Sequence, residues 1–493
     1  MRIRLWASAV LFVFIAYMFD FEAHLYPTWD DNRNLQILDE MMRGQWQNLY
    51  QHASPAFYLL FLPLAYVATP TGLAFACTVC HLGGQLLAAS LIGRQLALPN
   101  GLRIYAFLAL ALCPLSLFTG HSFTVEAPSL LFFWGGVFAL YFRRPWLAGL
   151  LLGLAVGINY KVLLWLGLLF IAALAERLME NGKCVPAGQA FSIKTRVLPF
   201  ATTFGLTLIL LSLPAFWLPM HPLQYARSLF AVAILRPVNP LSEGNSALDV
   251  FFYLRYLFEW DNLLPLLLVL ALSYSWWKLN TREPGVLGQT ALARTLLMWS
   301  ILLILVMTFL PKAPRALYPI MPALFTLAIF SARMWGGGGQ RTGRRLAWFV
   351  GPVLLIVSAV QAVRAYYPYR SRAYYQAGAI VNALPATAIT SPFSFNLYSR
   401  LNATHRTQFK APLKCNIEPV KGAMLVDDPY RFLVGCRTPE LEEADETLPN
   451  AAVDSPILWL EHCEFTGITY EEALERRSRR LGKGQVLIVM SEE

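Results

Sequence analysis

Long apolar segments separated by short polar ones make up most of this chain. Eleven of these segments are roughly 15 to 23 residues long, close to the length of a helix that crosses a bilayer. They lie at residues 3–20, 71–93, 103–119, 125–142, 145–159, 162–177, 197–217, 262–278, 293–311, 316–334 and 346–364. The pattern therefore predicts an α-helical polytopic membrane protein, with about 11 transmembrane helices in residues 1–364.

Lysine and arginine gather in alternate loops between these segments. Arg2 and Arg4 precede the first segment, and further basic residues occupy the loops near residues 94–103, 143–144, 177–196, 278–294 and 333–345. The positive-inside rule assigns these loops and the N-terminus to the cytoplasmic side. No small-residue cleavage site follows the first segment, so we expect an uncleaved span rather than a signal peptide.

Residues 55–69 do not fit this alternation. The segment is apolar but short, and it contains Pro55 and Pro63. If it crossed the membrane, every later loop would change sides and the arginine-rich loops would face outward. We therefore expect a helix that lies at the outer surface or re-enters from it.

Two long loops, residues 21–54 and 218–261, and the polar residues 365–493 fall on the outer side. In the C-terminal part, strand-like runs at 423–426, 457–460 and 486–490 alternate with helix-like stretches such as 470–480. This pattern predicts a small α/β extracytoplasmic domain. Three cysteines lie in it, Cys415, Cys436 and Cys463. One disulfide with one spare thiol is the simplest arrangement, and the sequence does not say which two pair.

Composition agrees with a membrane protein and excludes a nucleic-acid-binding one. Hydrophobic residues make up 56% of the chain and charged residues 14%, whereas a soluble chain has about 25% charged residues. The net charge of +10 comes from basic residues at the ends of apolar segments. No basic groove with interleaved aromatic residues is apparent in the sequence, so we do not interpret this charge as a nucleic-acid surface.

Several ionisable residues lie at the outer ends of the predicted spans. Carboxylates can bind a metal ion or remove a proton, and lysine and arginine can bind a phosphate. Each residue alone is better explained as a solvated interfacial charge. Together they predict the transfer of a group from a phosphate at the outer membrane surface, with a divalent metal ion held by Asp30 and Glu126 as one option. The candidates are Asp30, Asp31, Glu126, Lys161, Lys312 and Arg315, with His52, His121 and Arg255 as additional ones.

Four segments follow one another in an order that is typical of one superfamily. WDDNRNLQILDEMMRGQWQNLYQHASPAFYLL holds an acidic pair, an amphipathic stretch, Gly-x-Trp and a proline-led apolar segment. GHSFTVEAPSLLFFWGGVFAL holds a further acidic residue, AGLLLGLAVGINYKVLLWL is glycine-rich and ends near a lysine, and KAPRALYPIMPAL holds Arg-x-x-x-Pro-x-x-Pro. This order resembles the C-type, lipid-phosphate-dependent glycosyltransferases, in particular the protein O-mannosyltransferases and the lipid A aminoarabinose transferases.

The resemblance implies an enzyme of the cytoplasmic (inner) membrane that moves a hexosyl or pentosyl group. The sugar would pass from a polyprenyl-phosphate donor to a hydroxyl of a lipid, glycan or protein acceptor on the outer face. Asp30 would take the proton of the acceptor hydroxyl, with Asp31 beside it, and Glu126 would bind a metal ion or orient the acceptor. Lys161, Lys312 and Arg315 would bind the donor phosphate.

The chain departs from the superfamily pattern at two places. The superfamily often has Asp-Glu where this chain has Asp30-Asp31. Some members have Glu-Lys before the proline that matches Pro55, where this chain has Ala53-Ser54. Contacts of the donor phosphate with this stretch therefore do not carry over, and His52 is a candidate substitute.

Two other classes of function fit a polytopic membrane protein. A transporter or flippase of lipid-linked glycans should show internal repeats and charges near mid-membrane, and the sequence shows neither. A structural membrane protein with an outer sensing domain leaves the charged outer turns unexplained. We therefore prefer the glycosyltransferase hypothesis and keep the transporter as the alternative.

Overall fold

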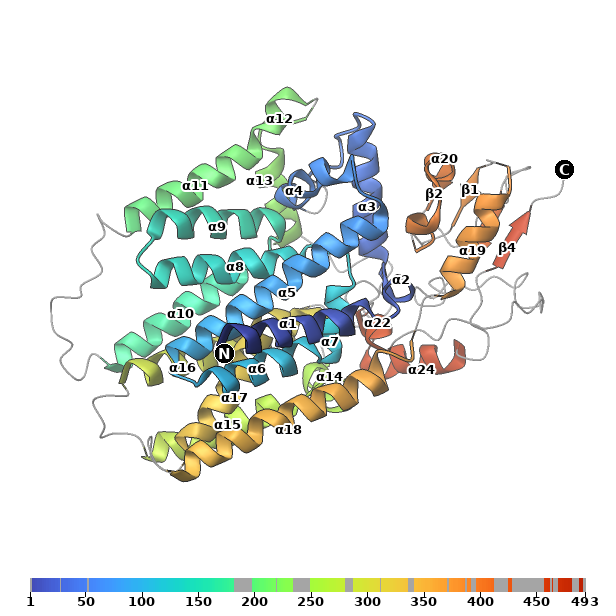
Figure 1. The fold of residues 1–493 in the computed structure, drawn as a ribbon. Coiled ribbons are helices and arrows are strands. Elements are labelled where there is room, and N and C mark those ends of the chain that lie inside the picture. Colours follow the sequence, from blue (N-terminus) through green and yellow to red (C-terminus); the bar gives the residue numbers. More distant parts are fainter. Residues whose placement is uncertain are drawn as a thin grey trace.

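The computed structural model describes most of the predicted membrane region and parts of the C-terminal tail. The described residues are 2–26, 28–50, 53–180, 197–218, 220–233, 249–279, 287–310, 312–335, 341–369, 372–385, 388–391, 396–411, 424–427, 456–461, 463, 469–480 and 487–490. Figure 1 shows long helices that lie side by side, with shorter helices and a small sheet at one end.

Each predicted span coincides with a helix or with a pair of consecutive helices. These elements are α1 (Arg2–Met18), α5 (Pro70–Gln95), α6 (Asn100–Ala111) with α7 (Pro114–Gly120), α8 (Glu126–Tyr141), α9 (Pro145–Ile158), α10 (Val162–Glu180), α11 (Leu198–Ser212) with α12 (Pro214–Trp217), α15 (Leu264–Leu279), α16 (Leu287–Thr308), η5 (Pro314–Ile320) with α17 (Met321–Met334), and α18 (Arg341–Ala365). The mostly helical fold is therefore confirmed.

The number of crossings stays a prediction. By length and hydropathy, five described helices can cross a membrane, namely Pro70–Gln95, Leu198–Trp217, Ala291–Thr308, Pro314–Met334 and Arg341–Ala365. The pair α6 and α7 makes a sixth if it is one span, bent by 69°. The helices α1, α8, α9, α10 and α15 match the remaining predicted segments but are shorter or only partly described.

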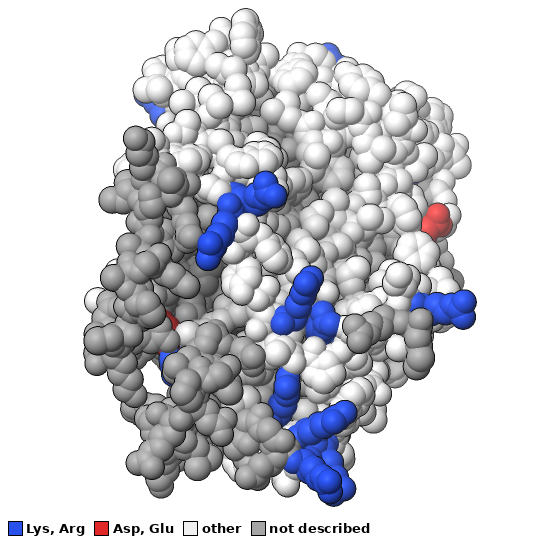
Figure 2. All heavy atoms as spheres, turned by 60° about the vertical axis from the view of Figure 1, so that its left-hand side comes forward, with Lys and Arg blue, Asp and Glu red and all other residues white. Residues whose placement is uncertain are grey.

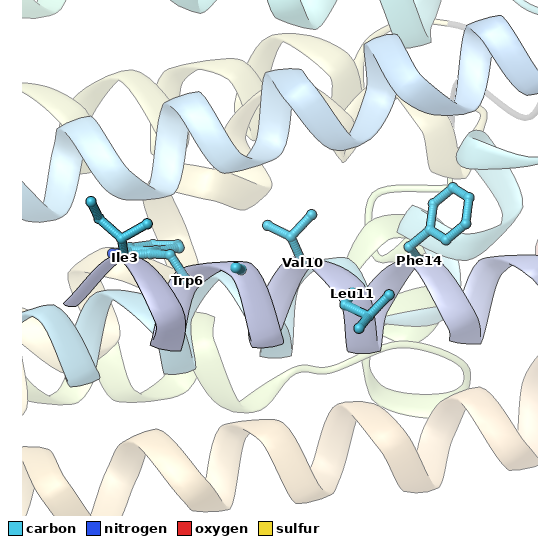
Figure 3. A pocket seen from close by; sticks show the side chains of 6 residues that line it. Ile3, Trp6, Val10, Leu11 and Phe14 are labelled. Carbon is cyan, nitrogen blue, oxygen red and sulfur yellow. The ribbon is translucent and has the colours of Figure 1, made fainter. Parts of the chain in front are cut away.

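The segment η5–α17 lies at the centre of the bundle. In its most apolar stretch 83% of the residues are buried, more than in any of the other four long spans. Helix α17 contacts α5, α6, α15, α16 and α18. At the periphery, α1 exposes Leu11, Phe12 and Ile15. Figure 3 shows a shallow apolar groove along α1, lined by Ile3, Trp6, Val10, Leu11 and Phe14. Such an apolar face is suited to contact with lipid chains.

Small residues allow α9 and α11 to pack closely. Gly149, Gly153 and Gly157 are spaced four apart on one face of α9, and a Cβ at Gly149 would lie within 2.4 Å of the Phe200 carbonyl oxygen of α11. Small residues at this spacing are typical of helix pairs in membranes.

Basic side chains mark one end of the bundle. Arg143 and Arg144 lie exposed between α8 and α9, and Arg341, Arg344 and Arg345 lie exposed at the start of α18. Figure 2 brings this end forward and shows many more Lys and Arg side chains than Asp and Glu. The distribution is the one that the positive-inside rule requires of a cytoplasmic face, and the sidedness itself stays a prediction.

Short helices cover the opposite end of the bundle (Figure 1). They are α2 (Phe21–His24), α3 (Trp29–Met42), α4 (Pro55–Ala65), α13 (Gln224–Ala233) and α14 (Phe252–Glu259). Helix α4 corresponds to the segment 55–69, and it packs against α3, α5 and α9. At 1.5 Å per residue it is roughly 16 Å long, about half of the hydrocarbon core of a bilayer, so it is too short to cross.

The described part of the tail contains a four-stranded sheet in the order β2-β1-β3-β4. The strands β1 (Ile389–Thr390), β2 (Phe409–Lys410) and β3 (Met424–Asp427) are parallel, and β4 (Leu487–Met490) is antiparallel to β3. The helical elements are α19 (Arg372–Ala383), η6 (Tyr398–Arg400), α20 (Ala403–Gln408), α22 (Pro456–Glu461) and α24 (Tyr470–Arg480). That residues 365–493 form an extracytoplasmic domain stays a prediction.

The local predictions for the tail have different outcomes. The strand predictions near 423–426 and 486–490 and the helix prediction at 470–480 are confirmed by β3, β4 and α24. The strand prediction at 457–460 is wrong, because these residues form helix α22. Pro456 favours a helix start, and a run of four apolar residues does not distinguish helix from strand. Cys463 is a free buried thiol, whereas Cys415 and Cys436 lie outside the described residues.

Candidate functional site

Helix α3 places the two acidic residues of the first outer loop in different environments. Thr28 and Asp31 form a capping box, in which the Thr28 N–H donates to Asp31 Oδ2 at 2.8 Å and the Asp31 N–H donates to Thr28 Oγ1 at 3.2 Å. Asp31 is fully buried, and burial raises the pKa of its carboxyl to about 8. Asp30 is 21% exposed and points elsewhere, to Arg315. In this structure Asp31 therefore stabilises the start of α3, and Asp30 faces the site.

Arg315 lies on η5, at the end of the central segment η5–α17. Ala313 is extended and Pro314 begins the 3₁₀ helix, which suits the fixed φ of proline. The Arg315 side chain is 9% exposed. Its Nη1 donates to Asp30 Oδ2 at 2.7 Å, and its Nε lies 3.9 Å from Glu126 Oε1. Residues that are 285 positions apart in sequence thus form one ion pair.

Glu126 is the first residue of α8, and it is buried. A carboxylate in the first helical turn is favoured by the helix dipole. Glu126 Oε2 is buried and has no hydrogen-bond partner among the described residues. Burying such an atom is costly, so the position is better suited to a functional group than to stability alone.

A third carboxylate reaches Arg315 from the C-terminal tail. Glu461, the last residue of α22, accepts a hydrogen bond from the Arg315 backbone N–H at 2.6 Å through Oε1. Its Oε2 lies 3.1 Å from Arg315 Nε. Glu461 is not among the residues that the sequence pattern indicates. Asp30, Glu126, Glu461 and Arg315 are named the Arg315 cluster below.

The two lysine candidates lie at turns at the same end of the bundle as Arg315. Lys161 lies between α9 and α10, and its backbone N–H donates to Asn159 Oδ1 at 3.0 Å. Lys312 lies between α16 and η5, where its Nζ donates to the carbonyl oxygens of Thr308 (2.5 Å) and Leu310 (2.8 Å). Lys312 therefore caps the last carbonyl group of α16 and one carbonyl group of the turn that follows. Burial lowers the pKa of Lys312 to about 8.

The additional candidates Arg255 and His121 make contacts outside the Arg315 cluster. Arg255 on α14 forms an ion pair with Glu471 on α24. His121 is buried, and its Nε2 lies 2.8 Å from the Tyr17 carbonyl oxygen and its Nδ1 2.6 Å from the Tyr366 hydroxyl. These contacts join α1, α7 and α18, so His121 has a packing role. His52 lies outside the described residues.

The described part of the chain does not provide a full set of ligands for the metal ion predicted at Asp30 and Glu126. Among these residues no group of three His, Cys, Asp or Glu side chains could hold a metal ion. Asp30 pairs with Arg315, and Glu126 approaches the same guanidinium. Arg315 thus occupies the place where these two carboxylates converge, and a metal ion there stays a prediction.

The fold of this chain occurs among solved protein structures. No protein-family model matches the chain, and a search of curated proteins finds no match. Among solved structures, the chain has the fold of a C-type membrane glycosyltransferase. The crystal structure of ArnT from Cupriavidus metallidurans in the apo state matches with a TM-score of 0.52 and 13% identity, over 88% of this chain and 94% of that chain. The same protein bound to undecaprenyl phosphate matches with a TM-score of 0.51 and 14% identity, over 87% and 94%.

ArnT is a lipid A aminoarabinose transferase. At these identities the likeness concerns the fold, and it confirms the resemblance to the C-type superfamily at that level. The likeness covers most of the chain.

Proposed function

We propose that this chain is a membrane glycosyltransferase. It moves a sugar from a polyprenyl-phosphate donor to an acceptor hydroxyl on the outer face of the cytoplasmic membrane. The observation that carries the proposal is the ion pair between the partly exposed Asp30 and the nearly buried Arg315, in a chain with an ArnT-like fold. The solved ArnT structure with undecaprenyl phosphate supports a lipid-phosphate donor.

The donor class also follows from the location of the site. The Arg315 cluster lies at the end of the bundle opposite the basic face, which is the outer end if the basic face is cytoplasmic. Nucleotide sugars are not expected outside the cytoplasmic membrane. A lipid-linked sugar reaches that side by flipping, and its phosphate is a leaving group that is stable as an anion.

The reaction can be written with the residues in place. The acceptor oxygen attacks the anomeric carbon, the bond between that carbon and the phosphate oxygen breaks, and the bonding electrons leave with the lipid phosphate. The proton of the acceptor hydroxyl passes to Asp30. A protonated Asp30 no longer balances the charge of Arg315, so the guanidinium becomes available to the phosphate as that group gains charge.

Charge balance indicates that Arg315 does not act alone on the donor. One cation faces three carboxylates in the Arg315 cluster, a formal net charge of minus two when all four groups are ionised. A phosphate adds further negative charge, which is costly in a buried site unless it is neutralised. We assign this role first to Lys161 and then to Lys312. Lys312 would have to leave the carbonyl groups of Thr308 and Leu310. A divalent metal ion bound through Glu126 is the alternative source of positive charge.

Transfer from defined donors tests the proposal. Purified protein in lipid nanodiscs is incubated with polyprenyl-phosphate mannose or polyprenyl-phosphate aminoarabinose, each with radiolabelled sugar, and with lipid, glycan or protein acceptors. The proposal expects labelled product and free polyprenyl phosphate, both absent with Arg315→Met. Transbilayer movement of the intact donor in liposomes, without any cleavage by the protein, would instead support the transporter.

A further inference from the structure

Glu461 links the C-terminal tail to the candidate active centre. Its two carboxylate oxygens contact the same residue, one at the backbone N–H of Arg315 and the other at Nε of the side chain. The Glu461 side chain is 3% exposed. A buried carboxylate at this distance from a guanidinium interacts strongly with it, because little water screens the pair.

The helix that carries Glu461 is fixed in the structure. Ile457 and Leu460 of α22 are fully buried and belong to the same apolar core as the membrane helices, and α22 contacts both η5 and α24. Helix α24 is held in turn by Tyr470, which donates to Glu259 Oε2 at 2.6 Å and accepts from Trp260 Nε1 at 2.9 Å. The packing of α22 on the membrane helices and on α24 therefore fixes the position of Glu461 independently of Arg315.

The two ion pairs act on different nitrogen atoms of the guanidinium. Asp30 binds Nη1 and Glu461 lies at Nε. The contact at Nη1 is a hydrogen bond, whereas the contact at Nε is an ion pair without hydrogen-bond geometry, so Glu461 attracts the guanidinium through its charge. The backbone contact from Glu461 Oε1 fixes the main chain of Arg315 in addition.

We propose that Glu461 is a positioning residue that holds Arg315 during sugar transfer, an inference that rests on the proposed function. When Asp30 takes the acceptor proton, its ion pair with Arg315 weakens. Glu461 then keeps the guanidinium in place at the moment when the leaving phosphate needs it. Glu461 thus stabilises the transition state rather than the bound donor, so its removal changes kcat rather than the KM for the donor.

A competing effect makes the opposite kinetic prediction. If Glu461 only occupied the part of Arg315 that the donor phosphate needs, its removal would tighten donor binding and leave or raise turnover. The two effects are therefore separated by the direction of the change in KM and kcat.

The decisive variant is Glu461→Gln, which keeps an oxygen for the Arg315 backbone N–H and removes the charge at Nε. Glu471→Gln is the matched control, because Glu471 also lies in the tail and pairs with an arginine, Arg255, but is 63% exposed and outside the Arg315 cluster. Glu461→Asp is the second variant, since it keeps the charge and withdraws it by about 1.5 Å.

We expect Glu461→Gln to lower kcat for transfer from the labelled donor about tenfold or more, with the donor KM changed by less than about twofold. Glu471→Gln should keep both constants. Glu461→Asp should fall between wild type and Glu461→Gln, and it serves as the test if Glu461→Gln does not fold. Thermal unfolding in nanodiscs checks that the variants are folded.

A double-mutant cycle with Arg315→Lys tests whether Glu461 acts through Arg315. In the Arg315→Lys background, Glu461→Gln should have a much smaller effect than in the wild type, because lysine has no guanidinium beside the Glu461 charge. Equal effects in both backgrounds, an unchanged kcat in Glu461→Gln, or a lower KM with equal or faster turnover would each overturn the inference. If the wild type itself transfers no sugar from any donor, the proposed function fails, and that result is distinct from the failure of Glu461 alone.

Discussion

Replacing Asp30 by asparagine tests the assignment of the proton acceptor. The change keeps the size of the side chain, removes its negative charge and prevents it from accepting a proton at neutral pH. In the structure it breaks the ion pair between Asp30 Oδ2 and Arg315 Nη1 at 2.7 Å. A neutral amide oxygen at the same position can still accept a weaker hydrogen bond.

The two expected effects differ widely in size. Loss of a general base typically lowers the rate about 10²- to 10⁴-fold, which corresponds to about 3–5 kcal/mol in the barrier. The effect on the free energy of unfolding should be small, about 1 kcal/mol, because Asp30 is partly exposed and the pair is screened by solvent. Arg315 also keeps Glu461 beside it.

Asp31→Asn provides a control at the neighbouring position. Asp31 accepts from the Thr28 N–H within the capping box, and an asparagine oxygen can take over this role. We expect Asp31→Asn to change kcat by less than about tenfold, because a cap acts on helix stability rather than on the reaction.

The assay measures initial rates of transfer of radiolabelled sugar in nanodiscs, at equal amounts of folded protein. Asp30→Asn should lose transfer while it still binds polyprenyl phosphate. If Asp30→Asn keeps near-normal kcat, or if Asp31→Asn is impaired to the same extent, the assignment of Asp30 is wrong.

Three further predictions concern the phosphate site, the pH dependence and the topology. Lys161→Met should weaken binding of the donor strongly while Lys161→Arg keeps part of it; equal kinetics in both variants would identify Lys161 as a helix anchor. Burial raises the pKa of Asp31 from 3.8 to about 8, so its contribution to stability is full below about pH 4 and is lost as the pH rises through 8. The melting temperature of the wild type should therefore fall more between pH 5 and 8 than that of Asp31→Asn, and equal slopes would contradict this. Single-cysteine variants in residues 177–196 should resist labelling by membrane-impermeant maleimide in intact cells, whereas labelling from outside would invert the topology.

Much of the fold was predictable because a bilayer imposes a simple pattern on sequence. A span must be continuous, apolar and long enough, so α5, α16 and α18 are visible as such. The charges at the ends of the spans then indicated that Asp30, Glu126 and Arg315 belong to one end of the bundle. Their contact depends on how the helices pack, which a single sequence does not show.

The sequence contains a pattern that distinguishes the role of Asp31 from that of Asp30. Thr28-x-x-Asp31 matches the spacing of a capping box, and this pattern assigns Asp31 to the start of α3. Both residues are catalytic candidates from the sequence, with Asp30 as the proton acceptor and Asp31 less important, because an acidic pair after a span suggests chemistry. The structure separates them because residues at adjacent positions of a helix point in directions about 100° apart.

Glu461 could not have been found in the same way. It lies in a tail with many acidic residues, 146 positions from its partner Arg315, and the preceding apolar run 457–460 was interpreted as a strand. As a strand, this run would place Glu461 on one face of a sheet. As a helix, it buries Ile457 and Leu460 against the bundle and directs Glu461 to η5.

The Arg315 cluster also explains why a glycosyltransferase would keep part of its tail in the active centre. Arg315 is almost buried, and a buried guanidinium without anions nearby would be strongly unfavourable. If Asp30 were its main counterion, the guanidinium would lose that partner in the step that protonates Asp30. A second carboxylate that takes no part in proton transfer removes this conflict. Glu461 meets the requirement, since it is held by the backbone N–H of Arg315 itself and by a helix packed on the bundle. The base and the anchor of Arg315 are thus separate residues, from opposite ends of the chain.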